Sequence, residues 1–224
     1  MDDSQIKAAF FGKVTASVTH ELQNILAIIS ENEALMEDVL MMHQDCSPET
    51  EQLIEQLAKS LESIKTQIAR GRQRTSELNT FAHNPDFAKA TFDMIEKIEN
   101  LVSITRRITA LSEVRVEIAD NQENQTLETD AVFFQAAVFI CIEMLTCNAF
   151  PGTVLTISLE KNKNRPAVQI KGSNPGNAQV FKNELSTLCT KKSSLWEKCT
   201  LVCGKTGFRI SVLKDHSGIE LIYC

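Results

Sequence analysis

The sequence predicts an α + α/β protein, in which an antiparallel helical hairpin dimerises into a four-helix bundle and precedes a two-layer α/β sandwich. Two long segments of the first half carry apolar residues at every third or fourth position, as amphipathic helices do. Asn84-Pro85-Asp86 then interrupts the pattern, and shorter helical and alternating segments follow it. We therefore expect two domains, residues 1–84 and 85–224.

The first helix is expected over roughly residues 4–44. His20 lies two positions from both Val18 and Leu22, which is about 200° around a helix from either. Its imidazole should therefore point away from the packed face, with Asn24 one turn further along and Glu21 beside it. The packed face itself is formed by Val14, Val18, Leu22, Ile25, Ile29, Met36 and Val39.

The second helix is expected over roughly residues 48–83. Ser47 is suited to cap it and Pro48 to its first position. Gly71 lies inside this helix at modest cost. The expected apolar residues are Leu53, Leu57, Leu61, Ile64, Ile68, Leu78 and Phe81.

The short turn between the two helices predicts that they run antiparallel. One hairpin cannot bury both apolar faces, whereas a second copy would complete a four-helix bundle. A homodimer is therefore expected, and the alternative is a hairpin packed on its own C-terminal domain.

The second half alternates between helical and strand patterns, mostly with antiparallel connections, which favours a two-layer sandwich. We expect helices over residues 93–112, 130–148 and 182–203, of which the helix over 130–148 should be buried. We expect strands around residue 92 and over residues 114–118, 154–159, 167–170, 208–213 and 219–223.

Composition narrows the possible functions. The 224 residues carry a net charge of -6, and no basic stripe for nucleic acid is visible. The sequence has seven cysteines and no CxxC pair, which favours small buried thiols in a reducing cytoplasm. We expect no metal site. The most apolar stretch is too short to span a bilayer, and no signal peptide precedes His20. We expect a cytoplasmic protein without a membrane anchor.

The string His20-Glu21-Leu22-Gln23-Asn24, followed by apolar residues, resembles the dimerisation and histidine-phosphotransfer domain of two-component sensor kinases. The resemblance implies that His20 is the phosphoacceptor and that Glu21 and Asn24 assist it. Many members carry proline five residues after the histidine, where this chain has Ile25. The helix should therefore be less kinked.

The order of elements beyond residue 85 resembles the ATP-binding domain of the same kinases, but its nucleotide motifs are degenerate. Met144 stands in place of the first of two asparagines, of which Asn148 is retained. A thioether is a poor ligand for magnesium. The segment that corresponds to the adenine-reading loop retains Gly176, but it has Asn174 in place of aspartate and Ala178 in place of the second glycine. No glycine-rich phosphate loop precedes the last long helix. We expect no tight ATP binding, with a weak remnant as the alternative.

Together these features resemble dimeric histidine phosphotransferases of phosphorelays. The implied reaction passes phosphoryl groups between response-regulator aspartates through His20, needs no cofactor of its own and uses magnesium supplied by the receiver. Receivers should dock near Ser17, Asn24, Ala27 and Glu31. Two other functions remain open: a non-catalytic adaptor that inhibits a kinase or receiver, and a receiver phosphatase that uses Glu21 and Asn24. Whether the chain is an enzyme therefore stays uncertain at this level.

Overall fold

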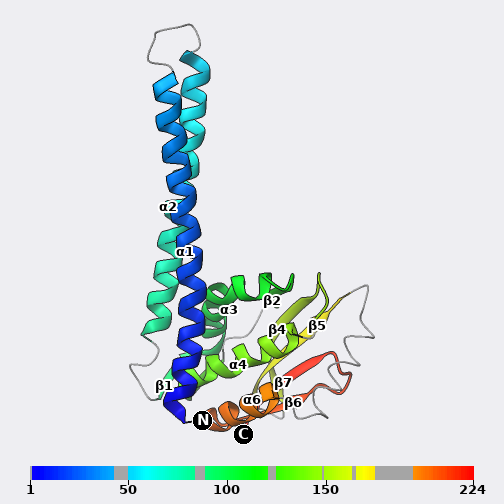
Figure 1. Cartoon of the computed structure of the whole chain (residues 1–224). Helices are drawn as coiled ribbons and strands as arrows, with labels where there is room; N and C mark the ends of the chain where they lie inside the picture. The colour runs from blue at the N-terminus through cyan, green and yellow to red at the C-terminus, as the bar shows by residue number, and fades with distance from the viewer. Residues whose placement is uncertain are drawn as a thin grey trace. The chain divides into compact units, whose positions relative to one another are not determined.

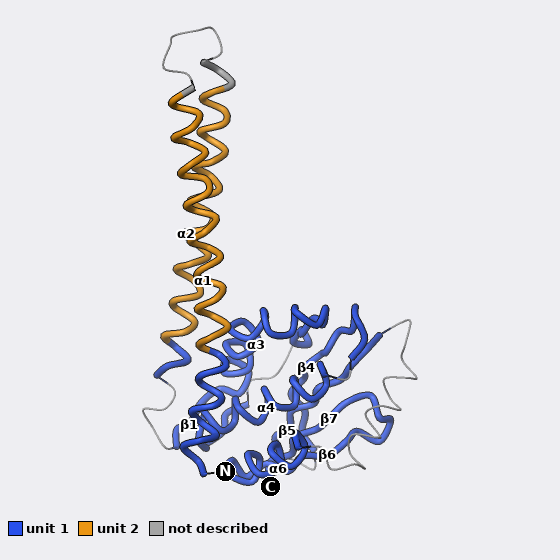
Figure 2. Tube along the Cα trace, in the orientation of Figure 1, with its two compact units in different colours: residues 1–14, 80–224 blue, residues 15–79 orange. Residues whose placement is uncertain are grey.

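The computed structural model describes residues 2–42, 50–83, 89–120, 125–147, 149–162, 165–174 and 194–224. Two compact units divide the chain, one of residues 15–79 and one of residues 1–14 with 80–224 (Figure 2). A helical part followed by an α/β sandwich is the architecture that the sequence predicts.

The helical unit contains most of α1 (Asp3–Met42) and α2 (Thr50–Ala82), which run side by side along their length (Figure 1). Val18, Ile25 and Val39 of α1 are buried. Gly71 does not interrupt α2, and a Cβ added there would meet Cγ2 of Ile25 at an ordinary 3.6 Å. The two predicted helices are thus present, while the predicted turn lies outside the described residues.

Large apolar side chains remain exposed on this unit. Ile54, Leu61 and Ile68 recur every seven residues on α2, which places them on one side of the helix, and each is at least 42% exposed. Helix α1 adds Leu26, Leu35, Leu40 and Met41, all more than half exposed. Leu61 and Ile68 belong to the predicted packed face, so a single hairpin leaves part of that face in water. The four-helix bundle stays a prediction.

The α/β unit contains a five-stranded sheet in the order β2-β4-β5-β7-β6. Strand β2 pairs in parallel with β4, and the other neighbours pair antiparallel. Figure 1 shows α3, α4 and α6 along one side of this sheet. The strands are β2 (Arg115–Ile118), β4 (Val154–Asn162), β5 (Arg165–Ser173), β6 (Phe208–Val212) and β7 (Gly218–Tyr223).

Three helices cover the sheet: α3 (Met94–Ala110), α4 (Ala131–Thr146) and α6 (Ser194–Thr206). Every residue of α4 except Glu143 is buried, which confirms the predicted buried helix. Asp93 and Asp130 cap α3 and α4, because each carboxylate accepts hydrogen bonds from two backbone N–H groups of the first turn.

The first 14 residues pack with the α/β unit, although the sequence suggested a division at residue 84. Phe10 is 6% exposed and contacts Phe81 and Phe139, with ring centroids 5.3 and 5.5 Å apart. Lys7 pairs with the capping carboxylate of Asp130 at 2.6 Å. These apolar and ionic contacts join the start of α1 to α4, so domain membership here follows burial and not chain order.

Several elements differ from their predicted bounds. Strand β3 (Thr126–Thr129), which pairs antiparallel with β1 (Ala90–Asp93), was not predicted at all. Strands β4 and β5 extend further because they pair with each other over nine residues, polar ends included. Helix α6 begins at Ser194 and continues to Thr206, and the earlier part of the predicted helix lies outside the described residues. Within the described ranges, no helix is both long and apolar enough to cross a membrane.

Candidate functional site

His20 lies on the exposed side of α1, as the helical spacing predicts. Asn24, one turn further along, is exposed as well, and Glu21 is half-buried. Ser17, Ala27 and Glu31 fall with His20 and Asn24 in a sector of about 80° around the helix, and Glu21 lies about 40° outside that sector. Ala27 and Glu31 are exposed, whereas the Ser17 hydroxyl is buried and makes no hydrogen bond to the described protein. His20, Asn24 and the predicted docking residues therefore share one side of α1.

Glu21 is held by an arginine that sequence reasoning missed. The Nε of Arg74 on α2 donates to the Glu21 carboxylate at 2.9 Å, and its Nη1 donates to Glu77 at 2.6 Å. Gln73 donates to the other Glu77 oxygen at 2.8 Å. Only the Arg74–Glu77 spacing of three residues could have indicated part of this cluster. The contact with Glu21 joins residues 53 positions apart.

The charges in this cluster are largely shielded from water. The side chains of Arg74, Glu21 and Glu77 are 15, 29 and 11% exposed. Partial burial lowers the pKa of Arg74, but the hydrogen bonds and charges of Glu77 and Glu21 outweigh burial and leave that pKa above its usual value. The ion pairs thus hold the charged guanidinium of Arg74 beside Glu21, the residue that follows His20.

An apolar groove of about 650 Å³ lies between α1 and α2 in the same unit. Leu22, Ile25 and Ile29 line one wall, and Ile68 and Gly71 line the other. The α1 residues of the groove stand about 120–180° around the helix from His20. The groove and the histidine therefore occupy different faces of the hairpin.

Two of the residues that the sequence analysis compared with nucleotide motifs, Met144 and Asn174, are buried in the α/β unit. Met144 is completely buried within α4. Asn174 is 7% exposed, and its amide donates to the Pro151 carbonyl at 3.2 Å and to the Thr153 hydroxyl at 3.0 Å. Both side chains are thus engaged inside the domain. Asn148, Gly176 and Ala178 lie outside the described residues.

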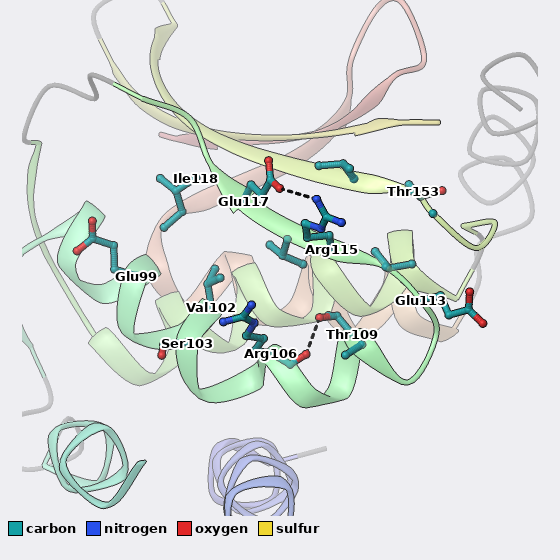
Figure 3. Close-up of a pocket in the computed structure, with 15 residues that line it drawn as sticks. Glu99, Val102, Ser103, Arg106, Thr109, Glu113, Arg115, Glu117, Ile118 and Thr153 are labelled. Atoms are coloured by element: carbon teal, nitrogen blue, oxygen red, sulfur yellow. Dashed lines mark hydrogen bonds and ion pairs between the residues drawn. The ribbon is translucent and has the colours of Figure 1, made fainter. Parts of the chain in front are cut away.

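A cavity of about 690 Å³ lies between α3 and β2 and contains none of the predicted site residues (Figure 3). Charges of both signs line it, with Glu99 near one end and Glu113 near the other, and Arg115 pairs with Glu117 at 3.6 Å. The sequence did not predict this cavity between α3 and β2. Its mixed charges show no preference for one class of ligand.

Three buried thiols meet between α4 and α6. The Sγ atom of Cys199 lies 3.4 Å from that of Cys141 and 3.8 Å from that of Cys203. The contact with Cys141 raises the pKa of Cys199 well above its usual value, and the contact with Cys199, with burial, raises the pKa of Cys203. Such thiols are poorly reactive. Among the described residues, no group of three or more His, Cys, Asp or Glu side chains could hold a metal ion.

No family model matches the sequence, and neither does any curated protein. Among solved structures, the Acinetobacter baumannii histidine kinase AdeS is 15% identical with a TM-score of 0.46, over 91% of this chain and 95% of that one. The catalytic domain of histidine kinase ThkA is 12% identical with a TM-score of 0.45, over 61% of this chain and 94% of that one.

A complex of ThkA with the response regulator protein TrrA is 14% identical with a TM-score of 0.39, over 99% of this chain and 63% of that one. These three solved structures are a histidine kinase, the catalytic domain of one, and a histidine kinase in complex with a response regulator.

Proposed function

We propose that the chain is a histidine phosphotransferase of a two-component phosphorelay, which passes phosphoryl groups between response-regulator aspartates through His20. The observation that carries this proposal is the exposed His20 on a long helical hairpin, with Asn24 and the half-buried Glu21 beside it. Site residues of this kind need only be presented to a partner, since the receiver brings its own magnesium and carboxylates. A relay between receivers belongs in the cytoplasm.

The proposed chemistry is a pair of phosphoryl transfers. A neutral imidazole nitrogen of His20 attacks the phosphorus of an aspartyl phosphate with its lone pair. A P–N bond forms while the P–O bond breaks, and the electron pair of that bond stays on the receiver carboxylate. The proton on the other ring nitrogen remains there. The reverse sequence then loads the second receiver, and catalysis consists mostly of in-line positioning.

We further propose that the protein lacks autokinase activity. Met144 is enclosed in the core of α4, where its thioether offers no oxygen to magnesium. Asn174 has no carboxylate to offer the adenine amino group, and its amide nitrogen donates to Pro151 and Thr153 instead. Phosphate would therefore enter from a receiver and not from ATP.

The homodimer belongs to the same proposal. The groove between α1 and α2 and the exposed Leu26 and Ile68 form an apolar surface on a face other than that of His20. Contiguous exposed apolar patches of this kind mark interaction sites in soluble proteins. A second hairpin packed there would bury the patch and leave His20 accessible.

Incubation with a phosphorylated receiver tests the proposal, with the phosphoryl label followed over time. Label that appears on His20 and is lost in His20→Ala supports the relay. His83→Ala and His216→Ala serve as controls that should relay normally. Label released as inorganic phosphate, with the loss slowed by Asn24→Ala, would instead show a receiver phosphatase. Label that stays on the receiver would show an adaptor.

A further inference from the structure

We propose that Arg74 is a positioning residue for phosphorylation of His20, an inference that rests on the proposed phosphotransfer. Arg74 fixes the Glu21 carboxylate against α2 and offsets its negative charge, so that a dianionic phosphoryl group can approach the neighbouring imidazole. Arg74 itself takes no part in bond making or breaking.

The hydrogen-bond geometry supports a fixed guanidinium. Glu77 lies one turn along α2 and accepts from Nη1 of Arg74, while Gln73 donates to the second oxygen of Glu77. Contacts within α2 thus orient the Arg74 side chain, whose Nε donates to the Glu21 carboxylate on α1 at 2.9 Å. A planar guanidinium held at two points transmits its orientation to the carboxylate it binds.

The position of the cluster distinguishes it from ordinary surface ion pairs. Lys59–Glu55 and Lys65–Glu62 join neighbouring turns of α2, and their side chains are 65–75% exposed. Such pairs contribute little because water screens them. The Arg74–Glu21 pair instead joins two helices, is mostly shielded, and ends on the residue next to His20.

The electrostatic reason follows from this placement. A phosphoryl group brings about two negative charges, and the Glu21 carboxylate one residue away repels it. Shielding from water strengthens that repulsion. The guanidinium binds both Glu21 and Glu77, so it offsets the Glu21 charge only in part. An unpaired Glu21 would repel the phosphoryl group more strongly and would be able to swing toward the imidazole.

The test uses the full chain and phosphoramidate, a small donor that requires no receiver. We expect Arg74→Gln to slow phosphorylation of His20 about tenfold, measured per folded molecule by mass spectrometry under alkaline conditions. Lys65→Gln removes the same charge from an exposed ion pair of α2 and should leave the rate unchanged. Arg74→Lys keeps the charge without the fork and should fall between the wild type and Arg74→Gln.

A double-variant comparison separates the proposed role from direct contact with phosphate. A Glu21→Gln background removes the carboxylate next to His20 and leaves only Glu77, on the other helix, paired with Arg74. Adding Arg74→Gln there should change the rate less than about threefold. If the tenfold loss persists in that background, Arg74 acts on the phosphoryl group itself and the proposal is wrong. An unchanged rate in Arg74→Gln would equally overturn it, because the ion pair would then be only structural.

The ¹⁵N signals of the His20 ring supply a reading that needs no phosphoryl donor. They should shift in Arg74→Gln and stay in place in Lys65→Gln, and identical signals in both variants would overturn the proposal. If phosphorylated receivers fail to label His20 while these rate and signal differences hold, the phosphorelay is wrong but the role of Arg74 beside His20 stands.

Discussion

Substitution of Leu26 by glutamine offers the sharpest test of the dimer. Leu26 is 62% exposed in the single chain, lines the apolar groove and lies on α1 away from His20. Full burial of a leucine side chain contributes about 1.5–3 kcal/mol. The exposed fraction therefore leaves about 2–4 kcal/mol to be gained by the two copies of a dimer.

The dissociation constant should rise by about 30- to 700-fold in Leu26→Gln, since each 1.4 kcal/mol corresponds to about a factor of ten. Sedimentation or light scattering over a concentration series measures it directly. Leu111→Gln is the matched control, because Leu111 is 76% exposed on the α/β unit and lies outside the hairpin. The fold of both variants should persist, since neither leucine is in a core.

Two results would refute this reasoning. A wild-type protein that stays monomeric at micromolar concentration would show that the hairpin has another partner or none. A dimer that Leu26→Gln leaves intact would place the interface elsewhere. Substitution of Ile25, which is 7% exposed in the single chain, cannot decide the matter because it would unfold the hairpin as well.

Further outcomes are expected from other parts of the chain. Calorimetry with magnesium-ATP should show no low-micromolar binding, and ATP alone should not label His20. His20→Ala should abolish relay yet change the free energy of unfolding by no more than about 0.5 kcal/mol, as at other surface sites. Phe10→Ala should cost about 3–5 kcal/mol in denaturant unfolding because its ring is enclosed by other aromatic rings. Above pH 9.0, the ordinary thiol pKa, the unfolded chain loses protons that the buried thiols around Cys199 retain, so stability should fall. Cys199→Ala should reduce that fall by up to about 1.4 kcal/mol per pH unit, whereas the exposed Cys224→Ser should not.

The sequence by itself determined the elements whose causes are local. Apolar spacing predicted both long helices and the exposed side of His20, because a helix repeats its faces within one or two turns. An almost wholly apolar segment likewise predicted that α4 is a buried helix. Met144 and Asn174 led by residue type alone to the expectation of no tight ATP binding, because a thioether offers magnesium no oxygen and an amide carries no negative charge.

Only the tertiary structure decided the contacts between distant segments. The pairing of Arg74 with Glu21 depends on the register of one helix against another, which no window of neighbouring residues contains. Strand β3 exists because β1 supplies its hydrogen-bond partners. The first 14 residues belong to the α/β unit because Phe10 packs against the ring of Phe139, 129 positions away. Burial of apolar surface stabilises such contacts whatever the distance along the chain.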